Sequence, residues 1–168
     1  MFQYQANEKF NNCFDNVFCG NVQIPNLPLK GPKCFDQILH YIHKSIEAEA
    51  NAADFYRCLL KEAPNRFSCE LIQRVYDDEL EHLQIFKKLY YYYTDCEPKY
   101  CVTPTPFPCY REGLLKALIG ELDAVRFYRN VQLSTMDQVI IDTFYMVMVD
   151  EQSHATIFST LYNSCPCK

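Results

Sequence analysis

Six residues of two kinds recur in this chain as two copies of one pattern, and their types are those that bind metal ions. In each copy a lone glutamate is followed, after the same interval, by a Glu-x-x-His pair. The first copy is Glu49, Glu79 and His82, and the second is Glu121, Glu151 and His154. Two lone glutamates and two Glu-x-x-His pairs form the ligand set of a carboxylate-bridged two-metal site inside a four-helix bundle. We therefore expect these side chains to hold two metal ions.

The charge of this ligand set indicates which metals it suits. Four carboxylates neutralise two divalent cations, and a mixture of imidazole and carboxylate suits iron or manganese. We expect two iron ions, with two manganese ions as the alternative. Without metal, four buried carboxylates in one layer are severely unfavourable. The metal-free protein should therefore take up protons or open at this layer.

Four further residues recur beside the ligands, with the same offset between the two copies. Tyr56 and Tyr128 lie seven residues, or two helical turns, after the lone glutamates. We interpret them as catalytic residues that donate hydrogen bonds to the ligand carboxylates or present oxidisable phenols to the metals, with core packing as the alternative. Asp78 and Asp150 directly precede the glutamates of the two pairs. A carboxylate there can accept the free ring N–H of a ligand histidine.

The elements that must position these residues are four amphipathic helices. Apolar residues recur at helical spacing over 34–63, and further helices are predicted over 68–93 and 110–131. A fourth helix is predicted to begin after Ser134 or Thr135, as its capping residue, and to end near residue 162. Four prolines exclude a helix from residues 95–109. The predicted fold class is all-α: a ferritin-like arrangement of helices, an up-down-down-up four-helix bundle with one long crossover between its second and third helices.

The spacing of the ligands places them at one level of this bundle. Pro64 lies midway between Glu49 and Glu79. A chain that folds back there puts both glutamates about 22 Å from the turn. Position 136 is likewise midway between Glu121 and Glu151. Each helical hairpin thus brings a glutamate opposite a Glu-x-x-His pair, and packing the two hairpins together collects the six ligands in one layer.

These ligands and loop lengths resemble the ferritin-like superfamily, and most nearly its rubrerythrin-like branch, over roughly residues 35–163. The resemblance implies a ferritin-like bundle with a di-iron centre that reacts with peroxide or dioxygen. It also implies a separate electron donor protein and a homodimer. Two features differ from full rubrerythrins: the chain has no Cys-x-x-Cys pair for a rubredoxin-like site, and Ala124 stands where rubrerythrins have a further glutamate. In this respect the six-ligand set is similar to bacterioferritin ferroxidase centres.

Composition and charge narrow the class of protein. The net charge is −5 with no block of like charges, so neither nucleic acid nor membrane is expected as a partner. No apolar stretch is long enough to span a bilayer. The first ten residues have neither the basic start nor the apolar centre of a signal peptide, so we expect a cytoplasmic protein. The predicted organisation is an extended arm over 1–33, the bundle over 34–163, and a cysteine-containing tail over 164–168.

The leading functional interpretation is an enzyme, a non-haem di-iron oxidoreductase that reduces peroxide or oxidises Fe(II) with dioxygen. A di-manganese catalase is one alternative. A structural or iron-sequestering protein of the cross-linked, spore-coat-like kind is another, favoured by ten cysteines, 13 tyrosines and no tryptophan. Most of the cysteines are expected to be free thiols, with Cys58 and Cys69 buried inside helices.

Overall fold

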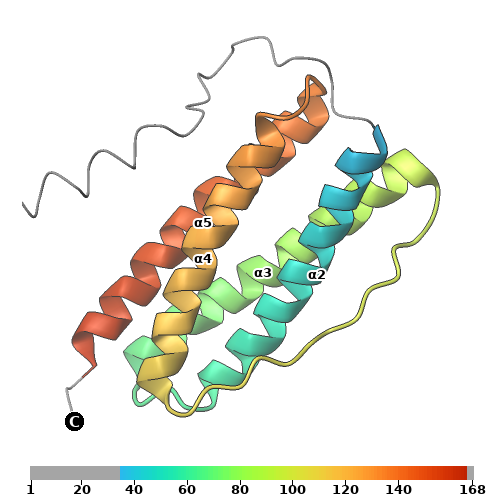
Figure 1. Cartoon of the computed structure of the whole chain (residues 1–168). Helices are drawn as coiled ribbons and strands as arrows, with labels where there is room; N and C mark the ends of the chain where they lie inside the picture. The colour runs from blue at the N-terminus through green and yellow to red at the C-terminus, as the bar shows by residue number, and fades with distance from the viewer. Residues whose placement is uncertain (1–34, 166–168) are drawn as a thin grey trace, which may run out of the picture. The chain divides into compact units, whose positions relative to one another are not determined.

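The computed structural model of the protein describes residues 35–165. Four helices make up most of this range and no β-strand occurs in it, so the predicted all-α class is confirmed. The helices are α2 (Phe35–Leu60), α3 (Arg66–Thr94), α4 (Tyr110–Gln132) and α5 (Gln138–Ser164) (Figure 1). None of them is long and apolar enough to cross a membrane. The arm predicted over 1–33 and the end of the tail, 166–168, lie outside the described residues.

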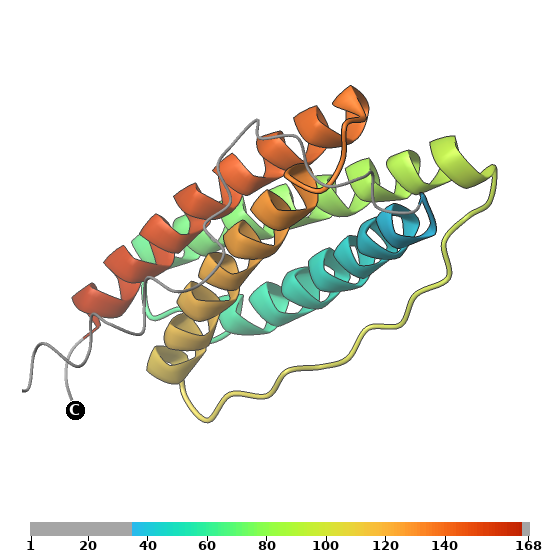
Figure 2. The same cartoon turned by 45° about the horizontal axis from the view of Figure 1, so that its top comes forward.

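The path of the chain pairs the helices into two hairpins. Short turns join α2 to α3 and α4 to α5, and the helices within each hairpin pack closely along their length. Residues 95–109 run the length of the bundle without a helix, so that α3 and α4 point in the same direction (Figures 1 and 2). Between the hairpins, α3 packs on α5 and α2 packs on α4. Each of the two hairpins therefore contributes one lone glutamate and one Glu-x-x-His pair to the interior.

Local chemistry explains the turn between α2 and α3. The last backbone N–H groups before Pro64 bond three residues back, from Lys61 to Cys58 and from Ala63 to Leu60, at 3.2 Å each. α2 therefore ends at Leu60, three residues before the predicted end, in a turn of tighter winding. Pro64 keeps the helix from continuing, because the residue before a proline disfavours the α-helical conformation. Asn65 then caps α3, since its side-chain oxygen accepts a hydrogen bond from the backbone N–H of Ser68 at 2.9 Å.

The predicted cap of the fourth helix is wrong. Asp137, rather than Ser134 or Thr135, caps α5, and its carboxylate accepts hydrogen bonds from the backbone N–H groups of residues 139 and 140. The Ser134 hydroxyl instead donates to the Val131 carbonyl, and the Thr135 hydroxyl accepts from the Asp137 N–H. Aspartate is among the best N-cap residues. Tyr93 at the end of α3 also donates to Asp137 at 2.7 Å, which fixes this carboxylate in place.

One cysteine prediction also differs from the structure. Cys69 is exposed rather than buried, because α3 turns the preceding residue, Ser68, into the interior and leaves Cys69 about 100° further round the helix. Cys58 is half-buried, and all six cysteines among the described residues are free thiols.

The apolar core is divided into two clusters. One is formed by the start of α2, the end of α3, the end of α4 and the start of α5, and includes Ile42, Phe86 and Phe144. The other is formed by the opposite ends of the same helices and includes Leu59 and Phe158. The six predicted ligands occupy the middle of the helices, between these clusters. They therefore lie in a layer whose two sides are sealed from water by packed side chains.

The crossover segment is tied to α2 and α4 by hydrogen bonds. The backbone N–H of Thr103 donates to Asn51 Oδ1 at 2.7 Å, and Lys116 Nζ donates to the Pro106 carbonyl at 2.7 Å. Near the start of α4, a Cβ atom at Gly113 would lie 2.6 Å from Leu59 Cδ1 and 3.1 Å from the ring of Phe107. A side chain at this position would force Leu59 of α2 or Phe107 of the crossover to shift, because the three segments meet closely here.

Candidate metal centre

The six predicted ligand residues come together in the interior of the bundle. All six are buried, with exposed fractions between 1% and 3%. They come from four helices: the lone glutamates from α2 and α4, and the two Glu-x-x-His pairs from α3 and α5. Charged side chains are almost never fully buried without partners of opposite charge or a metal ion. Their convergence therefore calls for cations at this place.

The six residues divide into two overlapping groups, each of which could hold one metal ion. The first group contains Glu49, Glu79, His82 and Glu151, and the second contains Glu79, Glu121, Glu151 and His154. Within each group the candidate ligand atoms all lie within 4.8 Å of one another. Ligands on opposite sides of an ion at about 2.2 Å are about 4.4 Å apart, so this size suits a bound metal. Glu79 and Glu151 belong to both groups and could bridge two ions.

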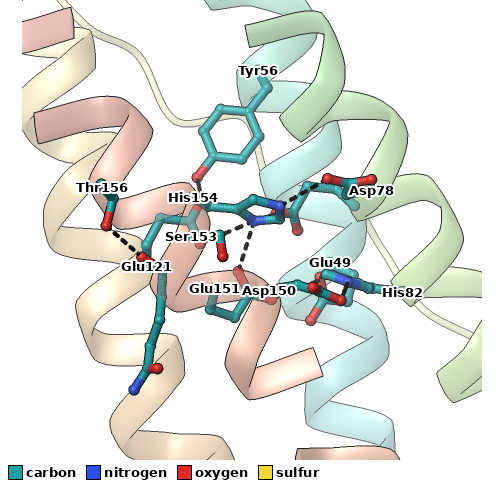
Figure 3. A network of polar contacts seen from close by, with 12 residues as sticks. Glu49, Tyr56, Asp78, His82, Glu121, Asp150, Glu151, Ser153, His154 and Thr156 are labelled. Carbon is teal, nitrogen blue, oxygen red and sulfur yellow. Dashed lines mark hydrogen bonds and ion pairs between the residues drawn. The ribbon is translucent and has the colours of Figure 1, made fainter. Parts of the chain in front are cut away.

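The imidazole rings face the carboxylates with their Nδ1 atoms. His82 Nδ1 lies 3.3 Å from Glu151 Oε1 and 3.6 Å from Glu49 Oε2. His154 Nδ1 lies 3.1 Å from Glu79 Oε1 and 3.2 Å from Glu151 Oε2. The centroids of the two rings are 5.7 Å apart. Figure 3 shows this arrangement, with Glu49 beside His82 and with His154 between Glu151 and Asp78.

Buried atoms without a well-formed hydrogen bond support the fit of this cluster to metal. Glu79 Oε1, Glu151 Oε1 and His82 Nδ1 are fully buried, and their contacts with the facing imidazole or carboxylate, at 3.1–3.3 Å, lack hydrogen-bond geometry. An unsatisfied buried polar atom costs about 1–3 kcal/mol, and more if the group is charged. The atoms left unsatisfied belong to both shared glutamates and to one histidine. Divalent cations at the two groups would coordinate all three.

The outer nitrogens of the two rings face aspartates of the opposite hairpin. His82 Nε2 lies 3.4 Å from Asp150 Oδ2, and His154 Nε2 lies 3.2 Å from Asp78 Oδ2. Both aspartate side chains are partly exposed, at 48% and 39%. A carboxylate that accepts the Nε2–H of a histidine fixes the tautomer that leaves Nδ1 free to bind a metal. Both aspartates thus lie where they can orient the predicted ligand histidines.

The two predicted tyrosines also contact glutamates of the opposite hairpin. Tyr56 on α2 donates a hydrogen bond to Glu121 Oε1 on α4, and Tyr128 on α4 donates to Glu49 Oε1 on α2. Both phenols are fully buried, and burial raises the pKa of each phenol well above its ordinary value. The charges of the nearby glutamates raise the pKa of each phenol further. Both remain neutral hydrogen-bond donors at physiological pH.

The electrostatics of the cluster describe its metal-free state. Burial raises the pKa of Glu79 and of Glu121 well above the ordinary value. The three other glutamates raise the pKa of Glu79 further, whereas for Glu121 the effect of Glu151 adds to burial and that of His154 opposes it. Burial alone would lower the pKa of both histidines, but hydrogen bonds and charges of the surrounding glutamates outweigh it and raise both to about 10. Burial also disfavours an ionised Glu151, yet close polar contacts with Glu121, His154 and His82 lower its pKa.

These directions favour protonated imidazoles and neutral carboxyl groups at Glu79 and Glu121 when no metal is bound. Proton uptake by the metal-free cluster stays a prediction. Four protons carry the same charge as two divalent cations.

A cavity of about 270 Å³ adjoins the cluster between α2 and α4. It is lined by all four glutamates and, within residues 35–165, by neither histidine. Sequence reasoning did not find this cavity. The available signal was a set of small residues four positions apart on the two helices: Ala48 and Ala52, and Gly120 and Ala124.

Comparisons with known proteins bear on the fold. No protein-family model matches the chain, and no curated protein matches it. Among solved structures, the chain is similar to the bacterioferritin of Rhodobacter capsulatus, determined with a metal-free dinuclear site and haem iron. The TM-score is 0.62 and the identity 18%, over 78% of this chain and 86% of that one.

A second solved structure is a two-domain protein from Anabaena variabilis with DJ-1/ThiJ/PfpI-like and ferritin-like domains. The chain matches it with a TM-score of 0.65 and 10% identity, over 80% of its own length. It spans 38% of the length of that protein. Both similarities show that the four helices have the ferritin-like fold.

Proposed function

We propose that this protein binds two iron ions in the cluster and is an oxidoreductase that oxidises ferrous iron with peroxide or dioxygen. The observation that carries the proposal is the sharing of Glu79 and Glu151 between two groups of buried ligands. A pair of ions held by common carboxylates can act on both oxygens of one oxidant molecule. The ferritin-like fold supports the proposal. The bacterioferritin to which this chain is similar in fold has a dinuclear site of its own, which makes a two-metal site a reasonable proposal for the same fold here.

The candidate ligands divide into two sets of roles in this proposal. Glu49 and His82 would hold one ion, Glu121 and His154 would hold the other, and the shared Glu79 and Glu151 would bind both. When bound, two ferrous ions supply the two electrons that, with two protons, reduce one hydrogen peroxide to two waters. The protein's own contribution is to fix the ligands, to close the site toward both ends of the bundle with the apolar clusters, and to hold the orientation of two carboxylates through the two tyrosines.

The proposal extends to the partners of this reaction. Repeated turnover with peroxide, as in the rubrerythrin-like branch, requires a separate donor protein to return electrons to the site. We also propose a homodimer and a cytoplasmic location, both from the resemblance and composition. With Ala124 in place of a further glutamate, the six-ligand set favours ferroxidase chemistry over the peroxidase reaction of rubrerythrins.

The test is anaerobic titration with ferrous iron, followed by metal analysis and then by addition of peroxide or oxygen. We expect two irons per chain and rapid oxidation. Glu79→Gln preserves side-chain volume but removes a bridging carboxylate, and should abolish the paired site. Glu81→Gln is the matched control, because Glu81 is exposed on the same helix. Little bound iron in the wild-type protein, or unchanged oxidation in Glu79→Gln, would overturn the proposal. Two manganese ions and oxygen release from peroxide without a reductant would replace it with a catalase.

A cross-linked structural protein is the second candidate. The observation that favours it is the exposure of thiols on the crossover and at its ends, at Cys96, Cys101 and Cys109, together with the exposed phenols of Tyr91 and Tyr92. Electrophoresis of native extracts without reductant tests this candidate. Thiol- or tyrosine-linked oligomers would support it, whereas monomer under these conditions would remove it.

A further inference from the structure

The cavity between α2 and α4 is larger than the chemistry of the metal cluster requires. Its volume of about 270 Å³ compares with about 30 Å³ for one molecule of liquid water. Dioxygen and hydrogen peroxide each contain two heavy atoms and would fill only a small part of it. A cavity of this size matches an organic molecule with about one aromatic ring.

The walls of the cavity are made of small and apolar side chains. α2 contributes Ala48 and Ala52, and α4 contributes Ala117, Gly120 and Ala124. These residues recur about every four positions, so on each helix they form one stripe that faces the cavity. Larger side chains on these stripes would close the space between the helices. The hollow therefore follows directly from the sequence at these positions.

Gly120 lies exposed at the mouth of the cavity, where it contributes no side chain. Glycine inside a helix costs about 0.5–1 kcal/mol relative to alanine. At Gly113 in the same helix, close packing against Leu59 accounts for that cost. At Gly120 a Cβ atom would meet nothing within 4 Å among the described residues. Packing does not require a glycine there, and its effect is to leave the mouth of the cavity wide.

The charges around the cavity select the kind of molecule that fits. At its rim, Lys116 is bonded to the Pro106 carbonyl, and Asn51 accepts from the Thr103 N–H. Within the described part of the chain, the lining holds no carboxylate besides the four cluster glutamates. A rim with a lysine and no acidic group does not attract ferrous ions. The mostly apolar walls disfavour an ionised ligand, because it would lose its hydration in the pocket without gaining a partner of opposite charge.

We propose that this pocket binds a small, uncharged organic molecule with a largely apolar body, seated against the glutamate side of the cluster. Phe55, Tyr56 and Tyr128 all line the pocket. These aromatic rings offer edges and faces for contact with a ring of the ligand. Binding in the pocket needs no metal, so the inference goes beyond the proposed function and stands separately from it.

The experiment measures binding of toluene, phenol and benzoate to the full chain, both metal-free and loaded with redox-inactive zinc. Calorimetry gives affinity, and NMR of ¹³C-methyl alanines locates the bound probe through Ala48, Ala52, Ala117 and Ala124. We expect toluene and phenol to bind one per chain and shift these four methyl signals. Benzoate should bind the metal-free protein at least about tenfold more weakly.

Three variants sharpen the test. Gly120→Leu and Ala52→Leu fill the pocket and should weaken toluene binding by at least about tenfold, whereas Gly120→Ala is the matched control and should stay within about twofold of wild type. Two filling variants guard against misfolding of one. Absence of toluene and phenol binding in both metal states, or equal binding by the filled variants, would overturn the inference. If the protein bound toluene or phenol but took up no iron, the proposed function would be wrong. The inference about the pocket would still hold.

Discussion

The hydroxyl of Tyr128 on α4 donates a hydrogen bond to the carboxylate of Glu49 on α2. Glu49 belongs to the ligand group of the other hairpin, together with His82. In the opposite direction, Tyr56 on α2 donates a hydrogen bond to Glu121 on α4. The aspartates also cross between the hairpins, since Asp150 faces His82 and Asp78 faces His154. Each hairpin therefore supplies the lone glutamate and the histidine of one candidate ligand group and the hydrogen bonds that can orient those of the other. We therefore expect metal binding to be coupled to the docking of the two hairpins.

Tyr56→Phe should weaken metal binding at the ligand group of the other hairpin, which contains Glu121 and His154. The change removes the hydrogen bond to Glu121 and leaves a buried carboxylate oxygen without its donor. Loss of a partner that orients a metal ligand lowers affinity by about 10–100-fold. We expect that loss in the group of Glu121 and His154, with little change at His82. Site-resolved NMR of the histidine ring protons in the cobalt-loaded protein measures the two ions separately.

Tyr128→Phe is the matched control for this prediction. By the same reasoning it should weaken the group of Glu49 and His82 and spare the other. If each tyrosine variant affected the ion of its own hairpin, or both ions equally, the crossed arrangement would not be the one that orients the ligands.

Metal binding should release protons into solution. The raised pKa values of His82 and His154, about 10 each, keep both imidazoles protonated at pH 7. Burial also raises the pKa values of Glu79 and Glu121, which hold a proton each in the metal-free cluster. Two divalent cations should therefore displace about four protons. Calorimetric titration with zinc in buffers of different ionisation enthalpy measures this number, and release of fewer than two protons would contradict the prediction.

The same shifts make the stability of the metal-free protein depend on pH. His82 and His154 have folded-state pKa values above the unfolded value of 6.5, so their contribution is complete below pH 6.5 and is lost as pH rises through about 10. The raised pKa values of Glu79 and Glu121 act in the same direction above pH 4.5. The lowered pKa of Glu151 acts oppositely, and its contribution is lost as the solution becomes more acidic than pH 4.5.

The free energy of unfolding of the metal-free protein should consequently be greatest near pH 4.5. Above this pH it should fall by about 1.4 kcal/mol per pH unit for each extra proton that the folded state holds, and more steeply above pH 6.5, where the two histidines add their protons to those of Glu79 and Glu121. Urea denaturation at pH 5.5, 7 and 9 in the presence of a chelator measures this. The zinc-loaded protein is the control and should be more stable at pH 9 than the metal-free one. A metal-free protein equally stable at pH 5.5 and 9 would show that the cluster does not bind these protons.

The candidate ligands could be predicted from the sequence because their geometry is local to each hairpin. Glu49 and Glu79 are equally far from the turn at Pro64, which places them at one level regardless of how the hairpins pack together. The apolar periodicity likewise located the helices to within a few residues. Their role as metal ligands stays a prediction until metal is measured.

The features that escaped prediction depend on contacts between elements far apart in the chain. Asp78 faces His154 of α5 rather than His82 of its own helix, and this is decided by the docking of α3 on α5. The sequence spacing does not distinguish between these two histidines. The cavity depends on the separation of α2 and α4. The sequence prediction placed the cap of α5 at Ser134 or Thr135, because three residues of capping type, including Asp137, lie within four positions. The hydrogen bond from Tyr93 of α3 supports Asp137 as the cap, and the sequence does not show that contact.

Two glycines of α4 should respond oppositely to alanine. At Gly113 the new Cβ would lie 2.6 Å from Leu59 Cδ1, and Leu59 is itself fully buried, so neither atom can move away without disturbing the packing of α2. Overpacking of this kind costs about 1–3 kcal/mol, which exceeds the gain of about 0.5–1 kcal/mol from replacing a helical glycine. Gly113→Ala should therefore destabilise the protein by about 1 kcal/mol or more. Gly120→Ala meets open space and should stabilise it by about 0.5–1 kcal/mol. Urea denaturation of both variants with metal bound measures the two changes, and a stabilising Gly113→Ala would show that α2 and α4 approach less closely than the structure has them.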